Sequence, residues 1–288
     1  MESKSQTWES ISGQVISYYE ETIFDYGFFW HTPNDLAIHY GFSDETTKSH
    51  SDRLLNENRF LADTARIKNV DYILDAGCGV GGSTIWLARN YGTRVVGIAV
   101  SPSQIAKAKI NSKNAGVEKL TEFYEMDYHS TDFPDATFDV IWAIESLCHS
   151  PDKPRLFQEL YRILKSGGRL IVADGFQKNK AANSQDQKVF NDFIHGLAVF
   201  QTTFWDEFRD GLVATGFRNI QRWDKTNAII PSAKKIYHLA LFFSPAWKLL
   251  NILGLISKVR RDNIRAGLAQ WNALKKDIWL YGVYYAEK

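Results

Sequence analysis

An acid and a series of glycines follow directly on an apolar run, within residues 73–82 (Ile-Leu-Asp-Ala-Gly-Cys-Gly-Val-Gly-Gly). Three glycines occupy every second position after Asp75: Gly77, Gly79 and Gly81. Glycine permits a tight turn and a close approach of a ligand to the backbone. The helix expected over residues 83–90 would point its N-terminus at the same place and can hold an anion such as a carboxylate. The segment therefore predicts a strand–turn–helix unit that binds a small molecule. Asp75 would orient the turn or a cationic group of the ligand, or else cap the helix.

A second pair of reactive side chains, Glu145 and His149, stands four residues apart just past another apolar run, 138–143. Either side chain can accept a proton as a general base, so the pair predicts acid–base chemistry at the end of a strand. Asp174 follows a later apolar run and could support His149. The alternative for both residues is a hydrogen bond that only holds neighbouring structure.

The composition is typical of a soluble enzyme. The 288 residues are 44% hydrophobic and 23% charged, enough for one large domain or a domain with a cap. A net charge of +1 offers no electrostatic footprint for nucleic acid. Cys78 and Cys148 cannot form a disulfide framework, and no metal-ligand spacing surrounds them. The polar residues 1–6 carry no apolar leader, so we expect a cytoplasmic protein and no protein-bound metal.

From residue 71 onwards, apolar runs alternate with helical patterns as in an α/β protein with a doubly wound sheet. The strands are expected at 71–75, 94–98, 121–125, 138–143, 168–173, 217–223 and 279–286. The helices between them are expected at 83–91, 102–115, 153–165 and 204–215.

Two segments fall outside this alternation, and we expect both to cover the edge of the sheet where its strands end. The predicted division is an N-terminal helical cap (1–66), a core (67–226), a helical cap insert (227–276) and a final core strand (277–288). The insert contains an apolar stretch, 236–257, interrupted by Pro245 and Lys248 and flanked by basic residues. Amphipathic cap helices are the preferred interpretation. Peripheral contact with a membrane is the alternative, ahead of a true span, which needs about 20 apolar residues.

The spacing of the glycines separates two families of nucleotide-binding turn. Dinucleotide-binding turns read G-x-G-x-x-G, whereas this chain has Asp-x-Gly-x-Gly-x-Gly. The latter resembles motif I of the class I methyltransferases that depend on S-adenosylmethionine (SAM). The resemblance implies SAM as cofactor and a Rossmann-like sheet of seven strands whose last strand is antiparallel.

The second expected strand runs into Gly-Ile-Ala-Val-Ser-Pro-Ser-Gln (97–104) and lacks the acid that usually accepts both ribose hydroxyls of SAM. This segment resembles tocopherol methyltransferases and cyclopropane synthases, in which a glutamine reaches the ribose, and so assigns that role to Gln104. After the third strand, Asp127 could bind the adenine amino group and Tyr128 could pack on the ring. Two alanines at strand ends complete the predicted cofactor site, Ala99 and Ala143.

Residues 142–152 (Trp-Ala-Ile-Glu-Ser-Leu-Cys-His-Ser-Pro-Asp) and the Leu-Lys-Ser-Gly-Gly turn at 164–168 look like sterol, tocopherol and related small-molecule methyltransferases. Rebeccamycin-type sugar O-methyltransferases share much of this pattern. The upstream Tyr18-Tyr19-Glu20 and the stretch 38–42 (Ile-His-Tyr-Gly-Phe) are similar to N-terminal elements of the same group. The resemblance covers most of residues 15–176 and implies that Tyr19 acts with Glu145 and His149.

Aromatic side chains of the N-terminal segment could contact an apolar acceptor, although ordinary core packing is the alternative. The predicted acceptor-binding residues are Tyr26, Trp30, Tyr40 and Phe42. The favoured reaction is methylation of carbon in a prenyl, terpenoid or sterol-like acceptor, through a carbocation and loss of a proton to a base. A diphosphate acceptor would also need Mg²⁺. Methylation of oxygen or nitrogen, with His149 as base, is the main alternative, and SAM binding without catalysis is a third.

Overall fold

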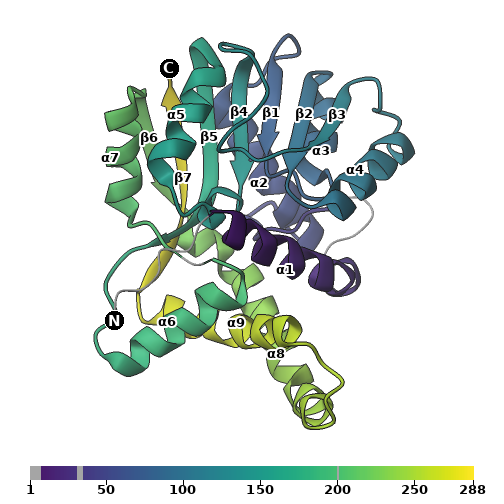
Figure 1. Ribbon diagram of the computed structural model, residues 1–288, viewed down its shortest axis with the longest axis vertical. Helices are drawn as coiled ribbons and strands as arrows, with labels where there is room; N and C mark the ends of the chain where they lie inside the picture. Colours follow the sequence, from purple (N-terminus) through teal and green to yellow (C-terminus); the bar gives the residue numbers. More distant parts are fainter. Residues whose placement is uncertain (1–7, 31–34, 200) are drawn as a thin grey trace.

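The computed structural model describes residues 8–30, 35–199 and 201–288, which form a seven-stranded sheet with helices on both faces (Figure 1). The strands are β1 (Tyr72–Ala76), β2 (Arg94–Ala99), β3 (Thr121–Glu125), β4 (Phe138–Ile144), β5 (Leu164–Gln177), β6 (Arg218–Asp224) and β7 (Trp279–Glu287). Their order across the sheet is β3-β2-β1-β4-β5-β7-β6. The first five are parallel, and β7 lies between β5 and β6, antiparallel to both. The predicted fold class, including the antiparallel last strand, is confirmed.

Helices alternate with the strands and continue beyond them. They are α1 (Trp8–Phe29), α2 (His50–Ala65), α3 (Gly82–Tyr91), α4 (Pro102–Asn114), α5 (Lys153–Ile163), α6 (Ser184–Gly196), α7 (Trp205–Thr215), α8 (Thr226–Ile252) and α9 (Lys258–Lys275). Helix α6 is not among the predicted helices, although Val189, Phe190, Phe193 and Ile194 stand at helical spacing within it. The single turn at Leu147–His149 is a 3₁₀ helix.

Each inner strand sends alternate side chains into two separate cores, as the pleat of a strand requires. In β1, Ile73 packs with α2 and α3 on one face, whereas Leu74 packs with α5 and α7 on the other. Burial on both faces explains why these strands read as continuous apolar runs in the sequence. The sheet is therefore a rigid support for whatever follows the strand ends.

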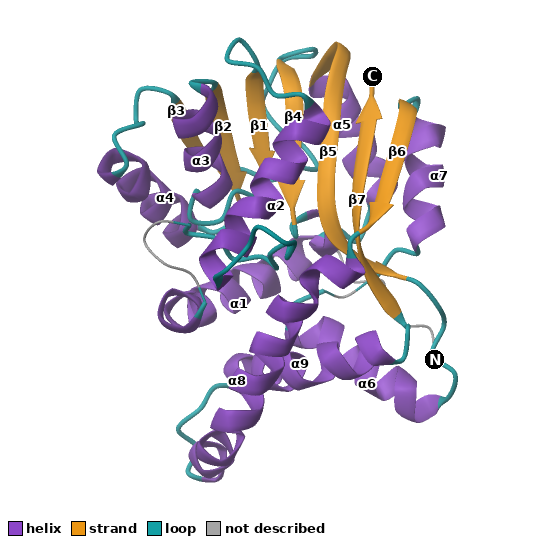
Figure 2. Ribbon diagram, turned by 180° about the vertical axis from the view of Figure 1, so that it is seen from behind, coloured by secondary structure: helices purple, strands orange, loops and turns teal. Residues whose placement is uncertain are grey.

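The remaining helices lie beyond the carboxyl ends of the parallel strands. In both views α1, α6, α8 and α9 gather at this end of the sheet, while α2 covers one of its faces (Figures 1 and 2). Hydrogen bonds join these elements to one another. Tyr18 of α1 donates to the Asn263 side chain of α9, and Arg260 donates to the Glu21 carbonyl. The helices thus form a cover over the edge at which doubly wound folds bind ligands.

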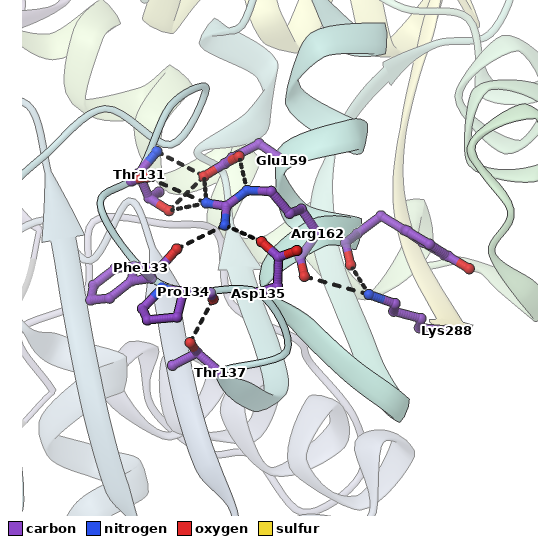
Figure 3. Close-up of polar contacts among 9 residues, drawn as sticks. Thr131, Phe133, Pro134, Asp135, Thr137, Glu159, Arg162 and Lys288 are labelled. Carbon is purple, nitrogen blue, oxygen red and sulfur yellow. Dashed lines mark hydrogen bonds and ion pairs between the residues drawn. The ribbon is translucent and has the colours of Figure 1, made fainter.

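At the opposite end of the sheet, where the parallel strand β4 begins, Arg162 at the end of α5 is the centre of a hydrogen-bonded network (Figure 3). Its guanidinium donates to Glu159, to Asp135 at 2.7 Å and to the Phe133 carbonyl at 2.8 Å. Glu159 in turn accepts the backbone N–H of Thr131. The network fixes the long connection from β3 to β4 far from the strand ends that carry Glu145.

None of the helices in the described part of the chain is both long and apolar enough to cross a membrane.

Candidate active site

The glycine turn after β1 has the strained backbone that its sequence predicts. Gly77, Gly79 and Gly81 have φ angles of 94°, 52° and 90°, a region that favours glycine. The backbone N–H groups of Gly77 and Cys78 both donate to the Ile98 carbonyl at 2.9 Å, so the turn is pinned to β2. Each glycine has a different reason to be there.

A side chain at Gly77 would collide with Ser146, since a Cβ would lie 2.3 Å from that residue's Cβ. At Gly81, which begins α3 without a side-chain cap, a Cβ would crowd Ala108 and Phe123. At Gly79, by contrast, a Cβ would enter open space and approach no closer than 3.8 Å to the Gln104 amide nitrogen. Gly79 therefore keeps the space beside Gln104 clear for a bound molecule.

Asp75 ties the turn to the helix that follows it. Its Oδ2 accepts the hydroxyl of Thr84, in the first turn of α3, at 2.6 Å. Burial raises the pKa of Asp75 to about 6, although the hydrogen bond from Thr84 opposes this shift. The side chain also lines the cavity described next, so Asp75 both ties the turn to α3 and faces that cavity.

A cavity opens above the turn, and we call it the glycine-turn cavity. Its walls include Asp75, Gly77, Gly79, Ala99, Gln104, Tyr128, Glu145, His149 and Tyr19. Three groups lie beside this cavity: the N-terminus of α3, which can bind an anion, Gly79, which leaves space free, and the buried amide of Gln104. These groups suit the carboxylate, the close backbone contact and the ribose diol of SAM. The residues present therefore fit the cofactor that the sequence implies.

The other predicted cofactor residues lie around this cavity rather than in its wall. Ala143 is buried in β4, one residue before the cavity-lining Ile144. Asp127 accepts the His129 backbone N–H at 2.8 Å and contacts its ring at 2.7 Å. In the described residues, no group of three or more His, Cys, Asp or Glu side chains is arranged to hold a metal ion.

Two further cavities adjoin the glycine-turn cavity. The first, the apolar cavity, lies between α8, α9 and the residues around Tyr40, and its wall is mostly apolar. The second, the α6 cavity, lies between α1, α6 and the ends of β4 and β5. Glu145 lines all three spaces, together with the apolar Ile38. Glu145 is thus the titratable side chain at which the three cavities meet.

The chain strains its backbone to place Glu145 there. Glu145 follows β4 with a φ of 46°, uncommon for a residue other than glycine and often associated with functional sites. Its Oε1 accepts the Tyr40 backbone N–H at 2.6 Å and the Tyr281 hydroxyl at 2.9 Å. Burial, reinforced by the nearby Glu57 carboxylate, raises the pKa of Glu145 to about 8. Such a carboxyl group changes charge close to neutral pH, as a general base must.

Behind Glu145 lies a hydrogen-bonded chain that sequence reasoning missed in part. The Tyr281 hydroxyl also reaches Glu57 Oε1 at 2.7 Å, and Glu57 Oε2 lies 2.8 Å from His39 Nδ1. Burial alone would lower the pKa of His39, but the Glu57 and Glu145 carboxylates raise it to about 9. Its Nε2 is buried with no hydrogen-bond partner in the described structure, and His39 lines two of the cavities.

Of these residues, only His39 belonged to a motif singled out in the sequence. A signal for Glu57 was available, because it is a charged residue on the apolar face of helix α2, where it is fully buried. Tyr281 carried no such signal, since an aromatic residue in a strand is ordinary.

Buried His149 and half-buried Tyr19 form a second pair. The Ala198 carbonyl accepts from His149 Nδ1 at 3.0 Å, so Nε2 is the acceptor in the neutral ring. The Tyr19 hydroxyl, 3.0 Å away, donates to that Nε2. Burial lowers the pKa of His149 to about 4, against the opposing effect of its bond to Ala198. His149 is therefore a weak proton acceptor that holds Tyr19 of α1 over the site.

The predicted acceptor residues separate into different environments. Trp30 and Tyr40 line the apolar cavity. Phe42 is buried in the core against Phe60 and Tyr281 and lies in the wall of none of the three cavities. The side chain of Tyr26 lies outside the described residues.

Comparison with known proteins agrees with the fold and with the motif after β1. Residues 74–172 match the family model described as a methyltransferase domain. A sterol 24-C-methyltransferase of Eremothecium gossypii is 31% identical over 213 residues, which are 73% of this chain and 56% of that protein. The chain spans about half the length of the first sterol methyltransferases it matches.

Solved structures share the fold at lower identity. The [4+2]-cyclase SpnF superposes with a TM-score of 0.79 at 22% identity, covering 96% of both chains. The geranyl diphosphate C-methyltransferase of Streptomyces coelicolor, in complex with Mg²⁺, geranyl diphosphate and S-adenosyl-L-homocysteine, gives 0.71 at 18%, covering 96% of this chain and 97% of that one. Motif, family match and fold agree, and the chain is a member of the class I SAM-dependent methyltransferase family.

Proposed function

We propose that the chain transfers the methyl group of SAM to a carbon atom of an apolar prenyl, terpenoid or sterol-like acceptor, with Glu145 as the base that removes a proton. One observation carries the proposal: Glu145 lies where the glycine-turn cavity meets two cavities that can hold an acceptor. The names of the relatives support it, since they include sterol 24-C-methyltransferases and a hydroquinone methyltransferase.

When bound, the cofactor supplies an electrophilic methyl group on a sulfonium. The turn at Gly77 and Gly79 and the start of α3 would hold its carboxylate end, and Gln104 would hold the ribose. Asp127, with Ala143 and Tyr128 nearby, would bind the adenine end. His39 Nε2 is a buried N–H without a partner among the described residues, and it can donate to a polar atom of the bound molecules.

The apolar cavity would hold the acceptor against Trp30, Tyr40 and the inner faces of α8 and α9. Excluding water from this space protects a carbocation on the acceptor, and aromatic faces stabilise it. Arg260 also lies in the wall and could meet a polar or anionic end of the acceptor. For a diphosphate, Mg²⁺ would be needed in addition.

The chemistry left to the protein is removal of one proton. Attack of the acceptor's double bond on the methyl group would form a carbon–carbon bond and break the methyl–sulfur bond, whose electron pair stays on the departing sulfur. A cation would remain on the neighbouring acceptor carbon. A C–H bond next to the cation then breaks, its electron pair forms the new double bond, and the proton goes to the Glu145 carboxylate. Because burial holds the pKa of Glu145 near 8, the carboxylate is a stronger base than an ordinary glutamate.

Two variants distinguish Glu145 from His149 as the base. Glu145→Gln keeps the acceptor oxygen for Tyr40 and Tyr281 but cannot take a proton. Turnover of a prenyl or sterol-like acceptor should fall about 10²- to 10⁴-fold, with SAM affinity nearly unchanged. In His149→Ala the loss should be much smaller. The reverse order would overturn the proposal and favour methylation of oxygen or nitrogen with His149 as base. Calorimetric SAM binding shows in each case that the variant is folded.

A further inference from the structure

Large apolar side chains that face solvent are concentrated at the end of α8. The structure shows ten strongly exposed large hydrophobic residues among those it describes, and six lie within residues 241–255. They are Leu241, Phe242, Leu249, Ile252, Leu253 and Leu255. Figures 1 and 2 show α8 and the start of α9 projecting from the body at one end of the molecule. We call residues 241–261 the α8–α9 tip.

The exposed residues of α8 lie along one side of the helix as a stripe, and Leu253 and Leu255 follow its end at Ile252. Phe242, Leu249 and Ile252 are seven and three residues apart, so they lie on the same side of a helix. Phe242 and Ile252 expose 77% and 80% of their surface. The opposite side of the same turns faces inward, because Phe243 and Trp247 line the apolar cavity. This part of α8 is thus apolar on both sides, and the protein covers one of them.

The charge around this stripe is one-sided. From Lys225 to Arg261 the sequence has seven basic residues and no Asp or Glu, in a chain whose net charge is +1. Lys258, at the start of α9 and within the tip, is exposed. Within residues 241–261 there are four basic residues and no acid, although Arg261 is paired with Asp262, which follows directly. Apolar side chains beside such net positive charge are complementary to an anionic lipid surface, where the apolar groups enter the acyl boundary and cations meet the headgroups.

We propose that the α8–α9 tip docks onto the surface of an anionic lipid bilayer. Phe242, Leu249 and Ile252 enter the interface, and the basic residues remain at headgroup level. The apolar cavity reaches Phe243 and Trp247, on the reverse of the inserted turns, so docking brings this cavity next to the lipid. A lipid-dissolved acceptor would then reach Glu145 without crossing water. This last step rests on the proposed function, whereas docking itself does not.

Vesicle binding of the full chain tests the proposal. The probes are vesicles of phosphatidylcholine alone and vesicles with roughly one third phosphatidylglycerol. The chain should sediment with the anionic vesicles, less so as salt rises, and weakly with the neutral ones. A double variant, Phe242→Glu with Ile252→Glu, should weaken this binding about tenfold or more. The matched control, Val70→Glu with Val213→Glu, alters two residues that are 79% and 57% exposed elsewhere, and should bind as the unaltered chain does.

Three results would overturn docking: no binding to anionic vesicles, equal binding by the tip variant, or equal loss in the control. A dimer in sedimentation velocity that the tip variant abolishes, with no vesicle binding, would assign the stripe to a second copy of the chain instead. Docking is measured without turnover. A chain that binds vesicles but methylates nothing would therefore support docking and refute the proposed function.

Discussion

Replacing Gly79 by alanine tests whether the turn after β1 is shaped around a ligand. Gly79 has a φ of 52°, and a Cβ there would enter open space near Gln104. Gly92 ends α3 with a φ of 67°, and a Cβ there would meet nothing within 4 Å. The two positions share the same kind of backbone strain, but of the two only Gly79 lines the glycine-turn cavity. Gly92→Ala is therefore the matched control for Gly79→Ala.

The structure separates the cost to folding from the cost to binding. Alanine in left-handed backbone costs about 1–2 kcal/mol, which for a chain of this size lowers Tm by about 2–4 °C. Both variants should show this loss. In Gly79→Ala the methyl group also occupies space meant for the cofactor. Overpacking by one methyl costs about 1–3 kcal/mol, so Kd for SAM should rise roughly 5- to 150-fold.

Isothermal titration calorimetry with SAM, together with thermal unfolding of the free proteins, measures both effects. We expect similar Tm values for the two variants and a weakened Kd for Gly79→Ala alone. The reasoning is refuted if Gly79→Ala binds SAM as tightly as the unaltered chain, or if Gly92→Ala loses as much affinity.

Three further predictions concern the buried titratable groups. Because Glu145 must be ionised to act as a base, kcat/KM should rise with pH to a plateau above about 8, and this limb should be absent from the residual activity of Glu145→Gln; a flat profile in the unaltered chain would contradict the assignment. Tyr281→Phe removes a hydrogen bond that lowers the pKa of Glu145, so the same limb should move to higher pH, and an unchanged limb would exclude this coupling. His149 stays neutral in the folded state down to about pH 4, whereas the unfolded chain protonates it near 6.5, so its contribution to stability rises with pH between these values and is lost as pH falls. Urea unfolding at about pH 4 and pH 6.5 gives the change in the free energy of unfolding between these two pH values. This change should be smaller in His149→Gln than in the unaltered chain by about 2–3 kcal/mol. An equal change in the two proteins would refute the lowered pKa of His149.

The glycine turn could be predicted from the sequence because its causes are local. The left-handed backbone at Gly77 and Gly79 follows from residue type, and the apolar run of β1 sets where the turn must lie. The parallel strands are buried on both faces, and they could likewise be predicted because such strands are continuous apolar runs in the sequence. The fold class and the position of the glycine turn therefore followed from short segments read one at a time.

The surroundings of Glu145 could not be predicted in this way. Tyr281 lies 136 residues further along the chain and reaches Glu145 only because β7 returns to pair beside β5. His39 and Glu57 come from a loop and a helix that precede the sheet entirely. The tautomer of His149 depends on the Ala198 carbonyl, which follows a helix that the sequence did not predict. Each of these contacts is set by the packing of elements that are distant in the sequence, so residue spacing cannot predict it.

The position of the transferred methyl group tests the central claim most directly. The chain would be incubated with SAM carrying a deuterated methyl group and a panel of acceptors: geranyl, farnesyl and isopentenyl diphosphate with and without Mg²⁺, a sterol, a tocopherol precursor and a phenolic glycoside. NMR and mass spectrometry of the product then locate the label. We predict a deuterated methyl group on a carbon atom of a prenyl or sterol-like acceptor, with loss of one acceptor proton. A label found only on oxygen or nitrogen, or SAM binding without transfer to any acceptor, would contradict the account.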